Sequence, residues 1–215
     1  MIVTIDGPAG AGKSSAAKAL AERLGFQFLD TGAMYRAVTL SAVRRQHDWT
    51  QHRALAELAR EIKIGIENRR VWIDNEEVTD AIRTFEITTL IHHAANNVEV
   101  REHLVDLQRL AAAGKDVVSE GRDQGTVVFP HAGCKIFLTA SPAERARRRL
   151  DDLIERGEQV TFEDVLAKQN LRDQRDAQRE YGPLIKAADA LEIVTDGMTR
   201  GAVVAQLESI ARARM

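Results

Sequence analysis

The chain opens with a β-branched run that leads through a glycine-rich loop into an amphipathic segment. Residues 2–5 are Ile-Val-Thr-Ile, and Gly7 follows almost at once. From residue 13 to residue 24 the apolar positions recur at helical spacing, and Gly25 stands where a glycine commonly ends a helix. This pattern predicts a strand, a loop and a helix in that order.

Similar apolar runs and periodic segments alternate along the rest of the chain. We expect four further strands, at residues 26–29, 117–118, 135–138 and 191–194. Helices are expected at about 33–45, 54–62 and 84–113 (with a break near residues 96–97), and then from 142, from 161 to about 179, and from 199. Strands that alternate with helices predict an α/β fold with a five-stranded, mainly parallel sheet.

One segment leaves this order. Residues 63–66 and 71–73 alternate around Asn68-Arg69-Arg70, which predicts a hairpin or small antiparallel sheet. We therefore expect a single domain over residues 1–215 with a small antiparallel insert that begins at about residue 62.

Composition narrows the class of protein. The chain has 215 residues, of which 44% are hydrophobic and 29% charged, a mix typical of a globular protein. A net charge of −2 argues against a nucleic-acid polymer as partner. The single Cys134 suits a reducing compartment, and the sequence shows neither a transmembrane segment nor a signal peptide. We expect a cytoplasmic protein without a membrane partner, and a monomer because no long apolar surface stripe is evident.

The glycine-rich loop carries the clearest chemistry. Residues 7–14 fit the pattern G-x-x-x-x-G-K-[ST], in which loop N–H groups and a helix N-terminus surround phosphates. Lys13 can reach the β- and γ-phosphates of ATP, and the Ser14 hydroxyl can ligate Mg²⁺. The alternative, a chance Gly/Ala loop, lacks a reason for the strand before it and the helix after it. The expected ATP-binding residues are Gly7, Pro8, Ala9, Gly10, Ala11, Gly12, Lys13, Ser14 and Ser15.

Other P-loop classes fit less well than small kinases. A GTP switch protein needs an Asn-Lys-x-Asp sequence, which is absent, and a large ATPase needs an apolar run ending in an acid, which residues 117–120 match poorly. A kinase for another small acceptor such as shikimate, and a nucleotide-binding regulator without catalysis, remain as alternatives.

Three later blocks contain candidate phosphate ligands: residues 30–36, 120–130 and 172–179. The first can equally be a helix N-cap by Asp30 or Thr31. The third block would place three side chains on one helix face: Arg172, Asp176 and Arg179. The same spacing is also typical of a solvated helix face with surface ion pairs. Two phosphate chains meeting in one cleft favour the binding interpretation, because guanidinium groups bind phosphate bidentately.

Together with the P-loop, these blocks resemble bacterial cytidylate kinase. The resemblance implies a P-loop kinase fold, transfer from ATP to CMP or dCMP, a CMP-binding insert at about 62–100, and a lid at about 143–159 in which Arg145, Arg148 or Arg149 would approach ATP. It implies that Lys13, Arg122 and Arg172 are catalytic. Because phosphoryl transfer needs positioning and charge neutralisation more than covalent chemistry, we also expect no nucleophilic residue and no dedicated base with a strongly shifted pKa. The substrate-binding residues it implies are Thr31, Arg36 and Arg122 at the acceptor phosphate, Tyr35, Arg172 and Asp176 at the ribose and phosphate, and Arg101, Asp123 and Arg179 at cytosine. The sequence departs from the family pattern at His92 and at Gln124.

Overall fold

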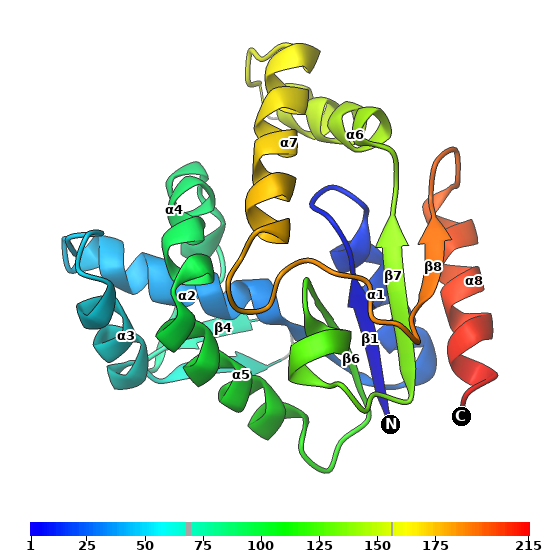
Figure 1. The fold of residues 1–215 in the computed structure, drawn as a ribbon, viewed down its shortest axis with the longest axis horizontal. Helices are drawn as coiled ribbons and strands as arrows, with labels where there is room; N and C mark the ends of the chain where they lie inside the picture. Colours follow the sequence, from blue (N-terminus) through cyan, green and yellow to red (C-terminus); the bar gives the residue numbers. More distant parts are fainter. Residues whose placement is uncertain (68–69, 156) are drawn as a thin grey trace. The chain divides into compact units, whose positions relative to one another are not determined.

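The computed structural model describes residues 1–67, 70–155 and 157–215. The chain divides into two compact units (Figure 1). Unit 1 comprises Met1–Phe28 with Gly114–Met215, and unit 2 comprises Leu29–Ala113.

A five-stranded sheet in the order β2-β6-β1-β7-β8 forms the centre of unit 1, except that the last two residues of β2, Leu29 and Asp30, are counted with unit 2. Its strands are β1 (Ile2–Asp6), β2 (Gln27–Asp30), β6 (Val117–Gly121), β7 (Cys134–Thr139) and β8 (Leu191–Val194). The pairs β1–β6, β1–β7 and β7–β8 are parallel, so the predicted sheet is confirmed. Four of the five β1 residues are buried, as expected for a central parallel strand covered on both faces.

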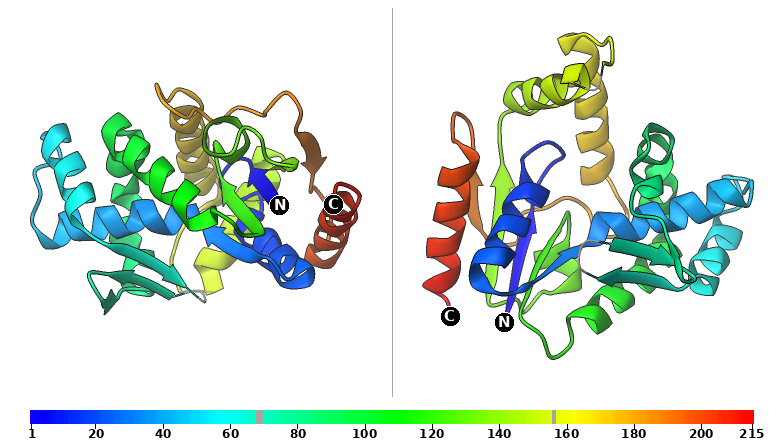
Figure 2. Two further views of the ribbon diagram at one scale, coloured as in Figure 1. Left: turned by 90° about the horizontal axis from the view of Figure 1, so that it is seen from below. Right: turned by 180° about the vertical axis from the view of Figure 1, so that it is seen from behind.

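The helices of unit 1 are α1 (Lys13–Leu24), α6 (Pro142–Glu155), α7 (Phe162–Ala177) and α8 (Arg200–Arg212). Helix α1 packs against β6 and α8, and Figure 2 shows α1 and α8 side by side. Gly25 ends α1 at φ 70°, as its position predicts. Helices α6 and α7 share a small core of their own, made of Ala146, Leu153 and Val165.

Unit 2 combines helices with a small antiparallel sheet. Its elements are α2 (Thr31–Arg44), α3 (His52–Glu61), β3 (Ile64–Glu67), β4 (Arg70–Ile73), β5 (Glu76–Glu77), the 3₁₀ turn η1 (Ala81–Arg83), α4 (Phe85–Asn96) and α5 (Val98–Ala112). The predicted pairing of residues 63–66 with 71–73 is confirmed by β3 and β4, to which β5 adds a third strand. The expected turn residues Asn68 and Arg69 lie outside the described part of the chain.

Asn97 explains why the expected long helix is two helices. Its backbone is extended (ψ 115°), and its side-chain oxygen accepts a hydrogen bond from the N–H of Val100 at 3.0 Å. Asn97 thereby caps α5 where α4 ends, which confirms the break expected near residues 96–97.

Two local features differ from the prediction. Residues Gln124–Val128 (η2) form a π-helical turn that was not predicted, in which the N–H of Phe129 reaches the carbonyl of Gln124 at 2.7 Å. Helix α7 ends at Ala177, so Arg179 does not share a helix face with Arg172 and that prediction is wrong. The helix stops because the chain folds back and Leu184 donates its N–H to the carbonyl of Asp176 at 2.8 Å.

No helix in the described ranges is long and apolar enough to span a membrane. Cys134 is a buried free thiol in strand β7.

Candidate active site

The loop after β1 has a backbone that only glycine permits at two points. A Cβ on Gly7, at φ 147°, would lie 1.9 Å from the carbonyl oxygen of Leu138 in β7. Gly10, at φ 78°, lies against helix α6, where a Cβ would come within 3.2 Å of the Cβ of Arg145. The loop is therefore held between β7 and α6, and Gly12 caps the N-terminus of α1.

Lys13 is the most electrostatically strained group of this loop. Its side chain is buried, and Nζ donates to the carbonyl oxygen of Pro8 at 2.8 Å. Burial, together with the positive charges of Arg122 and Arg172, lowers the pKa of Lys13 to about 7. The neighbouring carboxylates of Glu120 and Asp6 offset this only in part. Lys13 is thus a buried cation beside two further cations, Arg122 and Arg172.

Ser14 lies beside an acidic residue that the sequence analysis had not assigned to the site. Its hydroxyl donates to Oε1 of Glu120 at 2.8 Å, and Glu120 is buried near the end of β6. A hydroxyl and a carboxylate are oxygen donors of the kind that Mg²⁺ prefers. No group of three or more His, Cys, Asp and Glu side chains suited to a metal is found among the described residues. The Ser14–Glu120 pair fits a Mg²⁺ that takes its other ligands from phosphate and water.

Asp6, the last residue of β1, is a second buried acid that the sequence analysis missed. Its two carboxylate oxygens accept the backbone N–H groups of Gln124 at 2.8 Å and Gly125 at 2.7 Å. Burial raises the pKa of Asp6 to about 7, against the opposing effect of these two hydrogen bonds. Asp6 is bound to backbone groups, and the expectation that the site has no dedicated base with a strongly shifted pKa stays a prediction. The sequence feature that could have assigned Asp6 to the site is its position directly before Gly7.

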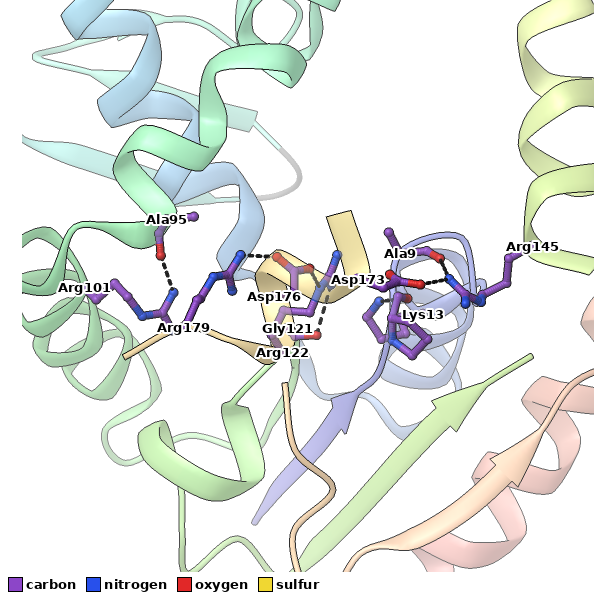
Figure 3. A network of polar contacts seen from close by, with 11 residues as sticks. Ala9, Lys13, Ala95, Arg101, Gly121, Arg122, Arg145, Asp173, Asp176 and Arg179 are labelled. Carbon is purple, nitrogen blue, oxygen red and sulfur yellow. Dashed lines mark hydrogen bonds and ion pairs between the residues drawn. The ribbon is translucent and has the colours of Figure 1, made fainter. Parts of the chain in front are cut away.

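Arginines from two segments converge on one carboxylate. Arg122, just after β6, donates from Nε to Oδ2 of Asp176 on α7 at 2.8 Å, and Arg179 contacts Oδ1 of the same side chain (Figure 3). Burial alone would raise the pKa of Asp176, but the charges of Arg122 and Arg179 outweigh burial and hold that pKa below its usual value. Arg172 adds to the same field. The structure thus brings together four of the predicted acceptor-site residues within unit 1.

The turn after Arg122 is held by buried polar contacts. The carbonyl of Asp123 accepts N–H groups from Val127 at 2.8 Å and Val128 at 3.2 Å, and the Asp123 side chain is buried. Gln124 is buried too, and its Oε1 accepts a hydrogen bond from the hydroxyl of Ser119 at 2.7 Å. The unusual residue at position 124 therefore has a structural partner within strand β6.

The remaining predicted acceptor residues belong to unit 2. Thr31 is buried at the start of α2, which Asp30 caps by accepting the N–H of Ala33 at 3.0 Å. Arg36 donates from Nη1 to Oγ1 of Thr88 at 2.8 Å. The guanidinium of Arg101 lies 5.3 Å from the centre of the Tyr35 ring and donates to the carbonyl of Ala95 at 3.0 Å (Figure 3). Unit 2 thus brings Tyr35 and Arg101 into contact.

The arginines of the expected lid have protein partners. Arg145 is buried and contacts the P-loop and α7. Arg148 donates from Nη2 to the carbonyl of Thr195 at 2.7 Å and from Nε to Glu144 at 3.0 Å. Arg149 is half-buried on α6.

Comparison with known proteins identifies the family. The family model described as cytidylate kinase matches residues 3–213. Cytidylate kinase of Rhodopirellula baltica is 50% identical over 199 residues, which cover 93% of this chain and 87% of that protein. A bifunctional pantoate ligase/cytidylate kinase of Acaryochloris marina is 45% identical over 99% of this chain, which spans 42% of that protein.

A solved structure of an uncharacterized protein from Eubacterium ventriosum shares the fold. Its TM-score is 0.54 at 14% identity, and the alignment covers 100% of this chain and 99% of the other. This likeness concerns the fold alone. The family match over nearly the whole sequence and the high identity to the curated relative agree with each other, and the chain belongs to the cytidylate kinase family.

Proposed function

We propose that this protein transfers the γ-phosphoryl group of ATP to CMP or dCMP and releases ADP with CDP or dCDP. The observation that carries the proposal is the positive charge around Lys13. Burial depresses the pKa of this lysine, and Arg122 and Arg172 lower it further, although glutamate and aspartate lie nearby. Such an arrangement is costly in a nucleotide-free protein and becomes favourable when phosphate chains bind.

ATP would occupy the P-loop from Gly7 to Ser15, with Lys13 at its β- and γ-phosphates. Mg²⁺, bound at Ser14 with Glu120 in reach, would neutralise charge on the transferred group. An oxygen of the CMP phosphate forms the new bond to the γ-phosphorus as the bond to the ADP oxygen breaks. Positioning and charge neutralisation account for catalysis, so no covalent intermediate with the protein is needed.

Acceptor-binding roles are assigned within each unit. In unit 1, Arg122 and Arg172 would bind the acceptor phosphate and stabilise the transition state, while Asp176 and Arg179 would bind the nucleoside. In unit 2 the corresponding residues would be Thr31, Tyr35, Arg36 and Arg101. The segment at about 62–100 would act as the acceptor-binding insert and the segment at about 143–159 as the lid that excludes water.

Asp123 would select the base. Cytosine presents an N4 amine that a carboxylate can accept, whereas uracil presents an oxygen at that position. A buried mismatch of this kind costs about 1–3 kcal/mol, which corresponds to roughly tenfold to a hundredfold in specificity. The buried position of Asp123 supports this role, because a solvated carboxylate would discriminate little.

The test is kcat/KM for CMP, dCMP, UMP and AMP, measured by ADP release with the wild type, Asp123→Asn and the control Asp106→Asn. Asp106 is a surface residue of α5 whose side chain is 73% exposed, so its replacement should change nothing. Asp123→Asn should lower kcat/KM for CMP and narrow the gap to UMP, since an amide both donates and accepts.

Three results would count against parts of the proposal. A wild type that prefers UMP or AMP would contradict the CMP assignment, and one that releases no ADP with any nucleotide would point to the regulator alternative. An unchanged CMP/UMP ratio in Asp123→Asn would remove the role of Asp123 alone. The family match favours neither the regulator nor a shikimate-like acceptor.

As part of the same proposal the enzyme works as a cytoplasmic monomer. Its mass in solution would test the monomer, and cell fractionation would test its location.

A further inference from the structure

Arg145 joins three segments of unit 1 through one buried guanidinium. Its Nε donates to the carbonyl of Ala140, at the end of β7, at 2.9 Å. Its Nη1 donates to the carbonyl of Ala9 in the P-loop at 2.9 Å and to Oδ2 of Asp173 on α7 at 2.6 Å (Figure 3). The Arg145 side chain is 5% exposed, so these contacts are shielded from solvent.

The bond to Ala9 fixes the direction of a whole peptide unit. The chain has no cis peptide among its described residues, and in a trans peptide the C=O of one residue and the N–H of the next point in opposite directions. Because Arg145 holds the Ala9 carbonyl, the N–H of Gly10 must point away from α6. A P-loop binds phosphate through such backbone N–H groups.

The packing around Gly10 keeps this contact in place. A Cβ at Gly10 would lie 3.2 Å from the Cβ of Arg145 and 3.3 Å from Oε1 of Gln169 on α7. Gln169 in turn donates from Nε2 to the carbonyl of Pro142 at 3.0 Å, which ties α7 to the first residue of α6. The loop, α6 and α7 therefore meet at one point, with Arg145 at its centre.

We propose that Arg145 is a positioning residue of the ATP site: it orients the Ala9–Gly10 peptide so that the Gly10 N–H can donate to phosphate, and Asp173 orients Arg145. This inference rests on the proposed binding of ATP in the P-loop. It differs from direct contact between a lid arginine and the γ-phosphate, because an arginine that acts through the loop affects ADP and ATP alike.

The experiment measures binding of ADP, ATP and CMP by calorimetry, and kcat at saturating ATP and CMP. The variants are Arg145→Lys, Asp173→Asn, their combination, and Arg147→Lys as the control. Arg147 lies on the same helix with a 65% exposed side chain, and its partner is Glu144 one turn away. Lysine keeps the positive charge at position 145 but cannot reach three acceptors at once.

We expect Arg145→Lys to weaken ADP and ATP to the same extent, by about tenfold, which corresponds to one misdirected hydrogen bond. CMP affinity and saturated kcat should stay within about threefold, and Arg147→Lys should match the wild type. Asp173→Asn should weaken the affinities for ADP and ATP equally, by a smaller factor. The combined variant should bind both nucleotides as well as Arg145→Lys does, because the two residues act in one network.

Unchanged ADP affinity with a lowered kcat would overturn the proposal in favour of direct contact with the transferred phosphate. Equal losses for ADP and CMP, or additive losses in the combined variant, would overturn it in favour of general destabilisation. Should Arg145→Lys fail to fold, Asp173→Asn provides the test. A loss of ADP affinity without a loss of CMP affinity would support the proposal, and equal losses would overturn it. A wild type that binds neither ADP nor ATP would refute the proposed function itself, which is a separate result.

Discussion

Arg122 donates from Nε to Oδ2 of Asp176 at 2.8 Å, a bond that joins the end of strand β6 to helix α7. Arg179 contacts the other oxygen of the same carboxylate, so one acid holds two of the arginines proposed for the acceptor site. The Asp176 side chain is only 4% exposed. Since a buried carboxylate needs both partners, this small cluster sets the geometry of the site before any nucleotide arrives.

Asp176→Asn should impair both folding and acceptor use. Losing the buried charge leaves two cations without their partner, which should cost about 3 kcal/mol of unfolding free energy. The wild-type advantage should persist above pH 5, because the Asp176 pKa is depressed in the folded state and the stabilisation disappears only as pH falls through that lowered pKa. Urea unfolding at several pH values checks this. The surface variant Glu57→Gln, whose 56% exposed side chain pairs with Arg53, should show no measurable change.

Replacing Lys13 should stabilise the nucleotide-free protein while it strongly lowers the rate of phosphoryl transfer. The folded-state pKa of about 7 lies below the ordinary value, so the protonated lysine destabilises the fold below pH 7, and this cost declines as pH rises toward 10. At pH 6.5 the free energy of unfolding of Lys13→Met should therefore exceed that of the wild type by about 2 kcal/mol, and its melting temperature should be higher. At pH 9 the difference in unfolding free energy should be smaller. Phosphoryl transfer should fall by about 10²–10³-fold. A less stable variant at pH 6.5 would contradict the assignment of strain to this lysine.

Binding of ATP at pH 8 should take up protons from the solution. At that pH a lysine whose pKa is about 7 is mostly neutral, and the phosphates of ATP favour its charged form. Calorimetry in two buffers of different ionisation enthalpy should reveal uptake of a substantial fraction of one proton. The same titration with Lys13→Met should show none, and uptake that survives in this variant would assign the proton to another group.

Asp6→Asn should change how stability depends on pH. The folded pKa of Asp6 is raised to about 7, so the wild type loses stability as pH rises from about 4 to about 7, because the unfolded chain ionises first. Between pH 5 and pH 8 the stability of the wild type relative to the variant should fall by about 2 kcal/mol. Glu22→Gln, an exposed acid on α1, serves as the control with a flat difference. A flat difference for Asp6→Asn would show that its carboxylate is ionised throughout this range.

Local sequence patterns predicted the elements of this fold well where neighbours along the chain determine the structure. The run at residues 2–5, the helical spacing after Lys13 and the cap at Gly25 each depend on a few adjacent residues. The break at Asn97 was predicted for the same reason, because a side-chain cap is a local interaction.

Long-range contacts explain what the sequence analysis missed. Asp6 accepts hydrogen bonds from the backbone N–H groups of Gln124 and Gly125. Because every residue type except proline has such a group, no sequence motif predicts this contact. The Arg145 bond to the carbonyl of Ala9 is hidden for the same reason. Arg179 does reach Asp176, which lies three residues before it, but the end of α7 at Ala177 depends on the long-range fold-back of Leu184 onto Asp176.

The position of strand β1 at the centre of its sheet has a consequence for synthesis of the protein. Its two neighbours, β6 and β7, begin only at Val117 and Cys134. While the ribosome makes the chain, the segment Leu29–Ala113 is contiguous and can collapse around its own apolar cluster as soon as it emerges. Strand β1 is made before both neighbours, so it stays unpaired with its apolar residues exposed until β6 and β7 have been translated. A nascent chain stalled before Val117 would therefore expose an unpaired, aggregation-prone β-strand, and we expect chaperones to bind it.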